Sequence, residues 1–196
     1  GPAPSHDVPG ARELPTVLVE GYSLQLRDEG GFLGDQASQT AFRQLLEQWR
    51  PRHRRKGKKD PLGDLHSKEL SKSTLDAALK SGRASEATDL VHAAIEEFAE
   101  GMAEVIRGFM RQPSWKGVER IVIGGGFPES DVGERAVLQA AAILQEMGER
   151  VPLARICHDT DDAGLLGWVH LAPPELLEHY DAILALDLGG TNVRCG

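Results

Sequence analysis

The sequence has 196 residues, of which 40% are hydrophobic and 27% are charged, a composition typical of a globular chain rather than a disordered one. Thirty acidic residues against 22 basic ones give a net charge of −8, which argues against a protein built mainly to bind a nucleic-acid backbone. The two cysteines, Cys157 and Cys195, are too few for a disulfide framework, so we expect a reducing, cytoplasmic setting. No run approaches the roughly 18 apolar residues of a membrane span, so we expect no membrane partner.

The first quarter of the sequence predicts a lead-in, a pair of strands and one helix. Residues 1–15 carry four prolines and no periodicity, so we expect a flexible lead-in. Residues 17–26, VLVEGYSLQL, predict one or two strands with a break at Gly21, and the GGFLGD that follows predicts a turn. Apolar residues at helical spacing then predict a helix over 39–50 with one buried face, which Pro51 is expected to end.

A basic run follows this helix. Seven of the ten residues from Arg50 to Lys59 are lysine or arginine, a pattern typical of contacts with phosphate groups or nucleic acid. The run contains no aromatic residue and the whole chain is acidic, so a solvated loop is the favoured interpretation. We therefore expect no nucleic-acid partner.

Beyond the basic run, helices alternate with short apolar strands, which is typical of an α/β fold. A short helix is predicted over 71–79, with Ser71 or Ser73 as its N-cap, and a long core helix is predicted over 85–110. The remaining predicted elements are an apolar strand at 121–123 buried on both faces, a helix at 132–147, a strand at 151–157, a helical stretch at 162–171 and a strand at 183–186.

The last strand leads into a glycine turn with the chemistry of a phosphate site. Gly189 and Gly190 have no Cβ atoms to obstruct a phosphate, and Thr191 and Asn192 add a hydroxyl and an amide beside the backbone N–H groups. Asp187 lies at the end of the strand, where its carboxylate can hold a hydrated Mg²⁺ ion. A plain tight turn is the alternative interpretation of the glycine pair.

A second glycine motif follows the apolar strand at 121–123. Gly124, Gly125 and Gly126 allow the backbone to pack flat against a planar group, and an adenine ring is such a group. Taken alone, this pattern fits a mere tight loop equally well. A third string, DDAGLLG at 161–167, follows farther along the chain.

Together these three strings resemble the ROK sugar kinases. The DLGGTN string at 187–192, with Arg194 close behind, resembles the first phosphate motif of the superfamily that joins actin, sugar kinases and heat-shock chaperones. The glycines at 124–126 resemble the adenosine motif of ROK kinases, and 161–167 resembles a string near their C-terminus. The resemblance spans residues 71–194. It implies an actin-like (ribonuclease H-like) ATPase fold, ATP and Mg²⁺ as cofactors, and phosphoryl transfer to the hydroxyl of a sugar substrate.

The order of the motifs departs from that family. ROK proteins begin with the phosphate motif and end with DDAGLLG, whereas here DDAGLLG comes first, so the resemblance implies a circular permutation. A tandem fusion of two kinases is the alternative. We expect a lead-in with a possible strand pair at 1–30, a block like the ROK C-terminal lobe at 31–172, a linker at 173–182 and the start of the other lobe at 183–196, continuing beyond Gly196.

Two features of the family have no counterpart. The ROK zinc site needs a histidine and closely spaced cysteines, and Cys157, His158 and Cys195 have the wrong spacing, so we expect no bound zinc. The Asn-Asp segment that carries the catalytic base of the family is also absent. We therefore expect no catalytic residue in this fragment and no sugar phosphorylation by it, although the full-length protein is expected to be a kinase.

Other classes of protein fit part of the pattern. The ROK group includes sugar-sensing transcriptional regulators with a helix-turn-helix, but residues 1–70 show no clear pair of short helices. A non-catalytic protein that binds sugar or nucleotide is a further alternative. An actin-like or chaperone-like ATPase accounts for the phosphate motif and leaves DDAGLLG unexplained. The sequence leaves open the sugar and the oligomeric state, including a homo-oligomer.

Overall fold

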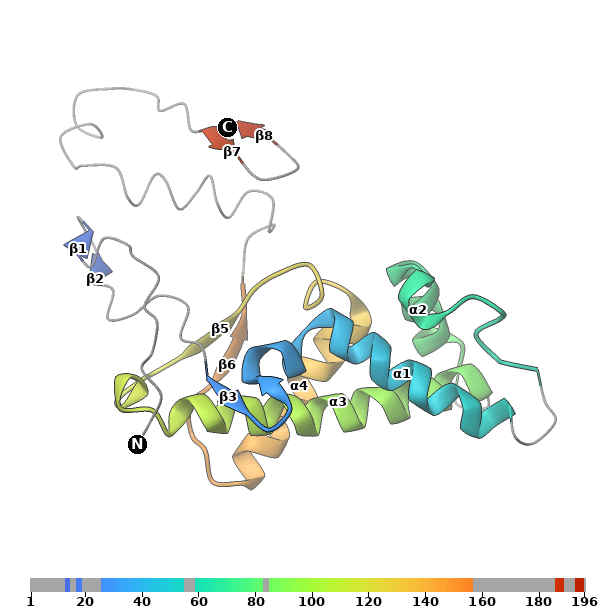
Figure 1. Ribbon diagram of the computed structural model, residues 1–196, viewed down its shortest axis with the longest axis horizontal. Helices are drawn as coiled ribbons and strands as arrows, with labels where there is room; N and C mark the ends of the chain where they lie inside the picture. Colours follow the sequence, from blue (N-terminus) through green and yellow to red (C-terminus); the bar gives the residue numbers. More distant parts are fainter. Residues whose placement is uncertain are drawn as a thin grey trace. The chain divides into compact units, whose positions relative to one another are not determined.

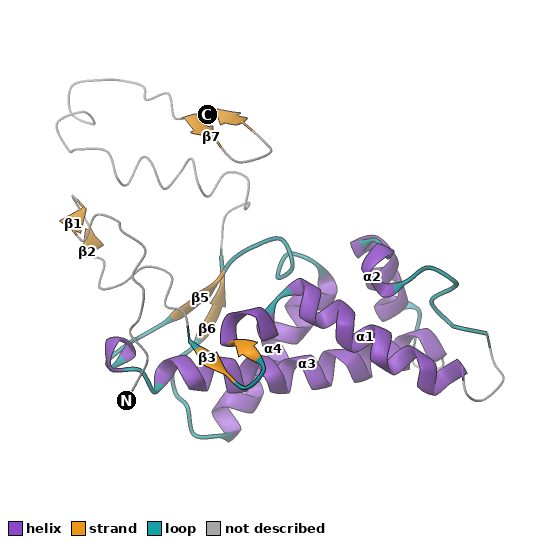
Figure 2. Ribbon diagram, in the orientation of Figure 1, coloured by secondary structure: helices purple, strands orange, loops and turns teal. Residues whose placement is uncertain are grey.

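The computed structural model describes residues 13–14, 17–18, 26–54, 59–82, 85–156, 186–188 and 193–195. The chain divides into two compact units, of which one is Gln25–Arg155 and the other combines Gly1–Leu24 with Ile156–Gly196. In the described residues, helices dominate and the strands form sheets of two, an α/β-like mixture (Figures 1 and 2). None of the helices in this part of the chain has the length and apolarity needed to cross a membrane.

Helix α3 (Glu86–Met110) is the centre of the larger unit, and the other described α-helices contact it (Figure 1). Its apolar residues recur every three or four positions and form one buried stripe, in which Val91, Ile95 and Phe98 are almost completely inaccessible. The helix predicted over 85–110 is therefore confirmed. The helices that pack on it are α1 (Gln39–Arg54), α2 (Lys72–Lys80) and α4 (Asp131–Glu146).

Short elements precede and separate these helices. The turn predicted at GGFLGD is shorter and earlier than expected: it is formed by Glu29 and Gly30 of a hairpin, in which the Asp28 carboxylate accepts a hydrogen bond of 2.7 Å from the Gly30 N–H. The rest of that string forms the second strand and a 3-10 helix. Ser71 caps α2 as predicted, because its hydroxyl accepts a hydrogen bond of 3.1 Å from the Thr74 N–H. The short elements are β3 (Arg27–Asp28), β4 (Gly31–Phe32), η1 (Leu33–Ala37), η2 (Ser67–Glu69) and η3 (Pro113–Trp115).

The strands β5 (Ile121–Ile123) and β6 (Leu153–Arg155) are parallel neighbours, and α4 is the crossover between them. Ile121 and Ile123 pack against the helical core, whereas the side chain between them, Val122, is 58% exposed. The expectation that this strand is buried on both faces is therefore wrong for the described part of the chain. Alternate side chains of a strand point to opposite faces, and the helices cover one face only.

The described residues of the smaller unit form two antiparallel pairs. In one, β1 (Glu13–Leu14) pairs with β2 (Val17–Leu18), and Leu14 lies directly opposite Val17. Residues 13–14 of the expected flexible lead-in therefore form a strand. In the other, β7 (Leu186–Leu188) pairs with β8 (Val193–Cys195). The strand residues predicted at 19–25 and 183–185 and the helical stretch at 162–171 lie outside the described residues.

The prediction that Pro51 ends helix α1 is wrong, because the helix continues to Arg54. A proline beyond the first turn of a helix removes one backbone N–H and places its ring against the carbonyl four residues before, which costs about 3 kcal/mol. Both Arg50 and Arg54 bind the same carboxylate oxygen of Asp60, at 2.7 and 2.9 Å from their Nε atoms. These ion pairs on either side of Pro51 hold the final turn in helical form.

Arg50 itself is fully buried, so the interpretation of the basic run as a solvated loop is wrong for its first residue. Its guanidinium donates to the backbone oxygens of Gly63 and Leu65 at 2.7 and 2.6 Å, in addition to Asp60. It also donates to the Ser67 hydroxyl at 3.2 Å. A buried charge is tolerated when its donors are satisfied in this way, and here the result is to tie the loop after α1 to the helix.

We predict that Arg50→Ala lowers the free energy of unfolding by about 3–5 kcal/mol, because it leaves the Asp60 carboxylate without its buried partner. The matched control is Arg52→Ala on the same helix, where the exposed guanidinium stacks on the Trp49 ring. That loss should be less than about 1 kcal/mol. Urea denaturation followed by circular dichroism measures both, and equal losses would contradict the assigned role of Arg50.

Acidification should weaken the same network. Burial raises the pKa of Asp60, but hydrogen bonds from Arg50, the Leu62 N–H and Arg54 outweigh burial and hold this pKa below its ordinary value. A carboxylate with a lowered pKa stabilises the fold above its unfolded pKa of about 4, and this stabilisation is lost as the pH falls through the folded pKa.

We therefore predict that the free energy of unfolding drops below about pH 4, and that the drop is smaller in Asp60→Asn. The comparison variant is Asp64→Asn, which changes an exposed carboxylate in the same loop. Urea titrations at several pH values give the slope for each protein. Identical slopes for Asp60→Asn and the unmodified protein would show that another group controls the acid response.

Candidate functional site

The glycine loop at 124–126 joins the carboxyl end of β5 to the segment before α4. Gly125 has φ of +100°, and an added Cβ there would meet no atom within 4 Å, so glycine is required for its conformation and not for space. Gly124 and Gly125 are exposed, whereas a Cβ on Gly126 would lie 2.8 Å from the Lys72 Nζ atom. Ligands of parallel sheets bind outside the carboxyl ends of the strands, which is where this loop lies.

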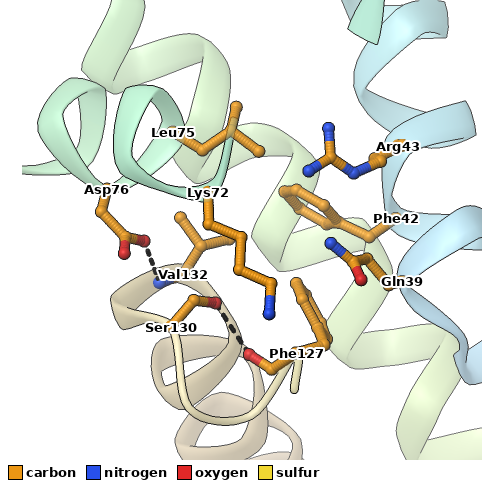
Figure 3. A pocket seen from close by; sticks show the side chains of 9 residues that line it. All are labelled: Gln39, Phe42, Arg43, Lys72, Leu75, Asp76, Phe127, Ser130 and Val132. Atoms are coloured by element: carbon orange, nitrogen blue, oxygen red, sulfur yellow. Dashed lines mark hydrogen bonds between the residues drawn. The ribbon is translucent and has the colours of Figure 1, made fainter. Parts of the chain in front are cut away.

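Phe127, directly after the glycines, anchors the loop to the helical core. Its ring lies 5.4 Å from the ring of Phe42 on α1 and 5.5 Å from that of Phe98 on α3. The latter pair is edge to face, a favoured geometry for aromatic rings. Figure 3 shows Phe127 beside Phe42 at the cavity between α1, α2 and the loop. Sequence analysis assigned no role to Phe127.

The N-terminus of α4 is held by two oxygen acceptors (Figure 3). The Ser130 hydroxyl accepts a hydrogen bond of 3.0 Å from the Gly133 N–H and donates one of 2.7 Å to the Phe127 carbonyl. The Asp76 carboxylate, which comes from α2, accepts a bond of 3.0 Å from the Val132 N–H. The positive end of the helix is thus already matched by an internal carboxylate. The exposed glycine loop therefore suits a neutral planar group better than a phosphate bound at this helix end.

Gly133 is a position where a side chain cannot fit. A Cβ on this residue would collide with the carbonyl of Phe127, because the loop backbone crosses directly over the first turn of α4. The Arg155 guanidinium also joins the loop to α4, since it donates to the Pro128 carbonyl at 3.0 Å and to the Glu134 carboxylate at 2.7 Å. The close approach of loop and helix therefore fixes the path of the chain that leaves the glycines.

We predict that Gly133→Ala lowers the free energy of unfolding by about 1–3 kcal/mol, because the loop and the helix must move apart. Gly101→Ala is the matched control within a helix, since an added Cβ there meets nothing within 4 Å. That change should raise the free energy of unfolding by about 0.4–1 kcal/mol, because alanine restricts the unfolded chain. Thermal and urea unfolding report both changes, and a stabilising Gly133→Ala would contradict the close approach.

Lys72 adds a positive charge beside the glycine loop. Its side chain extends from α2 (Figure 3). The Nζ atom donates a hydrogen bond of 3.0 Å to the Gly126 carbonyl. Among the described residues, no carboxylate forms an ion pair with it. The cavity next to it measures only about 10 Å³, which is space for about one water molecule. A ligand would therefore contact the outer surface of the loop and not fill this cavity.

Sequence reasoning missed Lys72 and Asp76 because they come from a helix more than 50 positions before the groups that they bind. Their chemistry was visible only as an ordinary lysine and aspartate on the polar side of α2. No short-range motif connects them with the glycine loop. Lys72 and Asp76 belong to the candidate site only because the folded chain brings α2 next to the glycine loop and the N-terminus of α4.

The predicted phosphate motif is only partly described. Asp187 lies in the middle of β7, and its direct partner in the antiparallel pair is Arg194 of β8. Gly189, Gly190, Thr191 and Asn192, which connect these strands along the chain, lie outside the described residues. Cys157, His158 and the DDAGLLG string also lie outside them. Within the described residues, no cluster of three or more His, Cys, Asp or Glu side chains is arranged to hold a metal ion.

Comparison with known proteins identified no relative of this chain. No family model, no curated protein and no solved structure matches this chain. The likeness to ROK kinases therefore rests on the three short strings and their chemistry. The site is accordingly interpreted from its own geometry: an exposed glycine loop at the end of a parallel strand, a nearby lysine and a capped helix.

Proposed function

We propose that this chain contributes the nucleotide-binding elements of an ATP-dependent sugar kinase of the ROK type, with an actin-like fold. The observation that carries the proposal is the setting of the IVIGGG string. Its apolar residues form β5 of a parallel β–α–β unit, and its glycines form an exposed loop at the carboxyl end, with Gly125 at φ +100°. A glycine loop in this position offers a flat backbone surface to an adenine ring.

In this proposal each glycine motif offers a surface for one part of a nucleotide. Gly124, Gly125 and Gly126 border the adenosine, and the capped N-terminus of α4 keeps that end of the site neutral. Gly189 and Gly190, with Thr191 and Asn192, cradle the phosphates. The pairing of β7 with β8 supports this part, because the four residues from Gly189 to Asn192 come between two neighbouring antiparallel strands in the sequence.

The chemistry in the complete kinase follows from this division of roles. Asp187 would help to hold Mg²⁺, and this ion would balance the charge of the ATP phosphates while ATP supplies the phosphoryl group. The residues of this chain bind and orient the nucleotide, and the group that accepts the proton from the sugar hydroxyl is not among them. Positioning and charge stabilisation supply most of the catalysis in phosphoryl transfer, so a region that only positions the nucleotide is a substantial part of such an enzyme.

A sugar-sensing regulator of the same group is less well supported. Between residues 26 and 70, the described parts of the chain hold a strand pair, two 3-10 turns and the single helix α1. A helix-turn-helix needs two helices joined by a short turn, with the second one free to enter the DNA groove. Moreover, Arg50 of the basic run is buried and is not available to a phosphate backbone.

We predict that adenosine and MgATP bind this chain, and that Gly125→Val weakens both by about tenfold or more. A β-branched side chain strains the backbone at φ +100° and stands where the planar ring should pack. Gly117→Val is the matched control, because Gly117 also has a positive φ of +86° and open space around it. Isothermal titration calorimetry measures the affinities, and circular dichroism checks the fold of each variant.

Three outcomes of this experiment count against the proposed function. The first is that neither adenosine nor MgATP binds the unmodified chain. The second is that Gly125→Val binds as tightly as the unmodified chain. The third is an equal loss in Gly117→Val, which would trace the effect to general strain and not to the glycine loop.

A further inference from the structure

A groove opens on the larger unit between the first turns of α1 and the 3-10 turn η2. Its volume is about 470 Å³, which is within the range of small-molecule sites. It shares Gln39 and Arg43 with the small cavity beside the glycine loop, but neither Lys72 nor Phe127 lines it. The residues that line the groove are Gln39, Thr40, Arg43, Gln44, His66 and Lys68.

Every ionisable side chain that lines this groove is basic, although the whole chain carries a net charge of −8. The nearest acidic groups are held by neighbouring residues, and the Glu47 carboxylate also lies 3.9 Å from the His66 Nδ1 atom, which accepts a hydrogen bond of 3.1 Å from the Lys68 N–H. The Glu47 carboxylate accepts hydrogen bonds from the Ser67 hydroxyl and N–H at 2.7 and 2.9 Å, and that of Glu69 accepts one from the His66 N–H at 3.3 Å. The groove therefore presents Arg43, Lys68 and the Nε2 side of the His66 ring to a ligand, and no carboxylate is among its lining groups.

Arg43 is the most informative of these groups. One of its terminal nitrogens, Nη1, donates to the Ser67 and Leu70 carbonyls at 2.7 and 2.6 Å, which fixes the guanidinium between α1 and η2. Among the described residues, its Nε and Nη2 atoms have no hydrogen-bond partner, and no carboxylate pairs with it. Partial burial lowers the pKa of Arg43 from its ordinary value. A half-buried cation without a counter-ion is costly, and an anion in the groove would offset that cost.

The rest of the lining favours an anion that also carries hydroxyl groups. Gln39 and Thr40 belong to the first turn of α1, which has no acidic residue, so the positive end of the helix dipole adds to the basic groups. The amides of Gln39 and Gln44 and the hydroxyl of Thr40 both donate and accept hydrogen bonds, as the hydroxyls of a polyol do. A lone phosphate ion would leave most of the volume empty.

We propose that this groove binds a small phosphorylated polyol of the sugar-phosphate class. Its phosphate contacts Arg43 and Lys68, with His66 beside them, and its hydroxyls contact Gln39, Thr40 and Gln44. This site is separate from the glycine loop at 124–126, so it does not depend on the nucleotide site assigned above. The ligand is held by charge and hydrogen bonds, and no bond is made or broken.

The experiment is a titration of the whole 196-residue chain with glucose 6-phosphate, inorganic phosphate and glucose, followed by amide NMR. Glucose 6-phosphate should shift the amide signals of 39–44 and 66–68, inorganic phosphate should shift the same signals at higher concentration, and glucose should shift none. Lys68→Gln should weaken the binding of glucose 6-phosphate by about fivefold, because it removes one exposed charge. Lys116→Gln, an exposed lysine outside the groove, should leave the affinity unchanged.

Arg43→Gln should weaken binding more than Lys68→Gln, and its urea unfolding curve shows whether the variant is folded. The Lys68 side chain is exposed and forms no hydrogen bond or ion pair with a described residue, so Lys68→Gln decides the question if Arg43→Gln fails to fold. The proposal is overturned if glucose 6-phosphate produces no shift up to about 10 mM, where weak binding is still visible. It is also overturned if the shifts centre on 124–126, if glucose or inorganic phosphate binds as well as glucose 6-phosphate, or if Lys116→Gln loses as much affinity as Lys68→Gln.

Discussion

Phe127 places its ring between Phe42 of α1 and Phe98 of α3, and the arrangement of the glycine loop depends on this contact. A loop of three glycines has little preferred structure of its own, because each glycine has wide backbone freedom. The aromatic anchor at one end and the strand β5 at the other remove most of that freedom. The loop can therefore stay exposed and still keep a defined shape, which is the combination that a binding loop needs.

The charges around α4 and α1 are balanced in different ways. At α4, Asp76 reaches the helix N-terminus from α2, so the positive end of the dipole is matched within the protein. At α1, the first turn contains no acidic residue and faces a groove lined by basic groups. Two helix ends in the same unit thus differ in whether their positive potential is already neutralised. This difference is the physical reason for proposing a neutral ring at the first helix end and an anion at the second.

The sequence predicted those elements whose signal is local. The apolar stripe of α3 and the serine cap of α2 depend on residues a few positions apart, and both were predicted to within one or two residues. Other features depend on contacts that are distant in sequence. The burial of Arg50 and the helical turn through Pro51 depend on partners in the following loop, and the exposure of Val122 depends on how many helices cover its strand. For the same reason the glycines of the site were found from the sequence, whereas Lys72 and Asp76 were not.

The hydrogen bonds to Ser67 affect how tightly the groove could bind a ligand. Arg43 binds the Ser67 carbonyl, Arg50 binds its hydroxyl, and Glu47 accepts from its N–H, so three residues of α1 hold η2 in place. The groove wall is therefore preorganised before any ligand arrives. Binding to a wall whose backbone is already ordered loses less conformational entropy, since the cost that remains is mainly that of ordering exposed side chains such as Lys68. A ligand in this groove would therefore lose less of its interaction energy to ordering the protein than a ligand bound by a mobile loop.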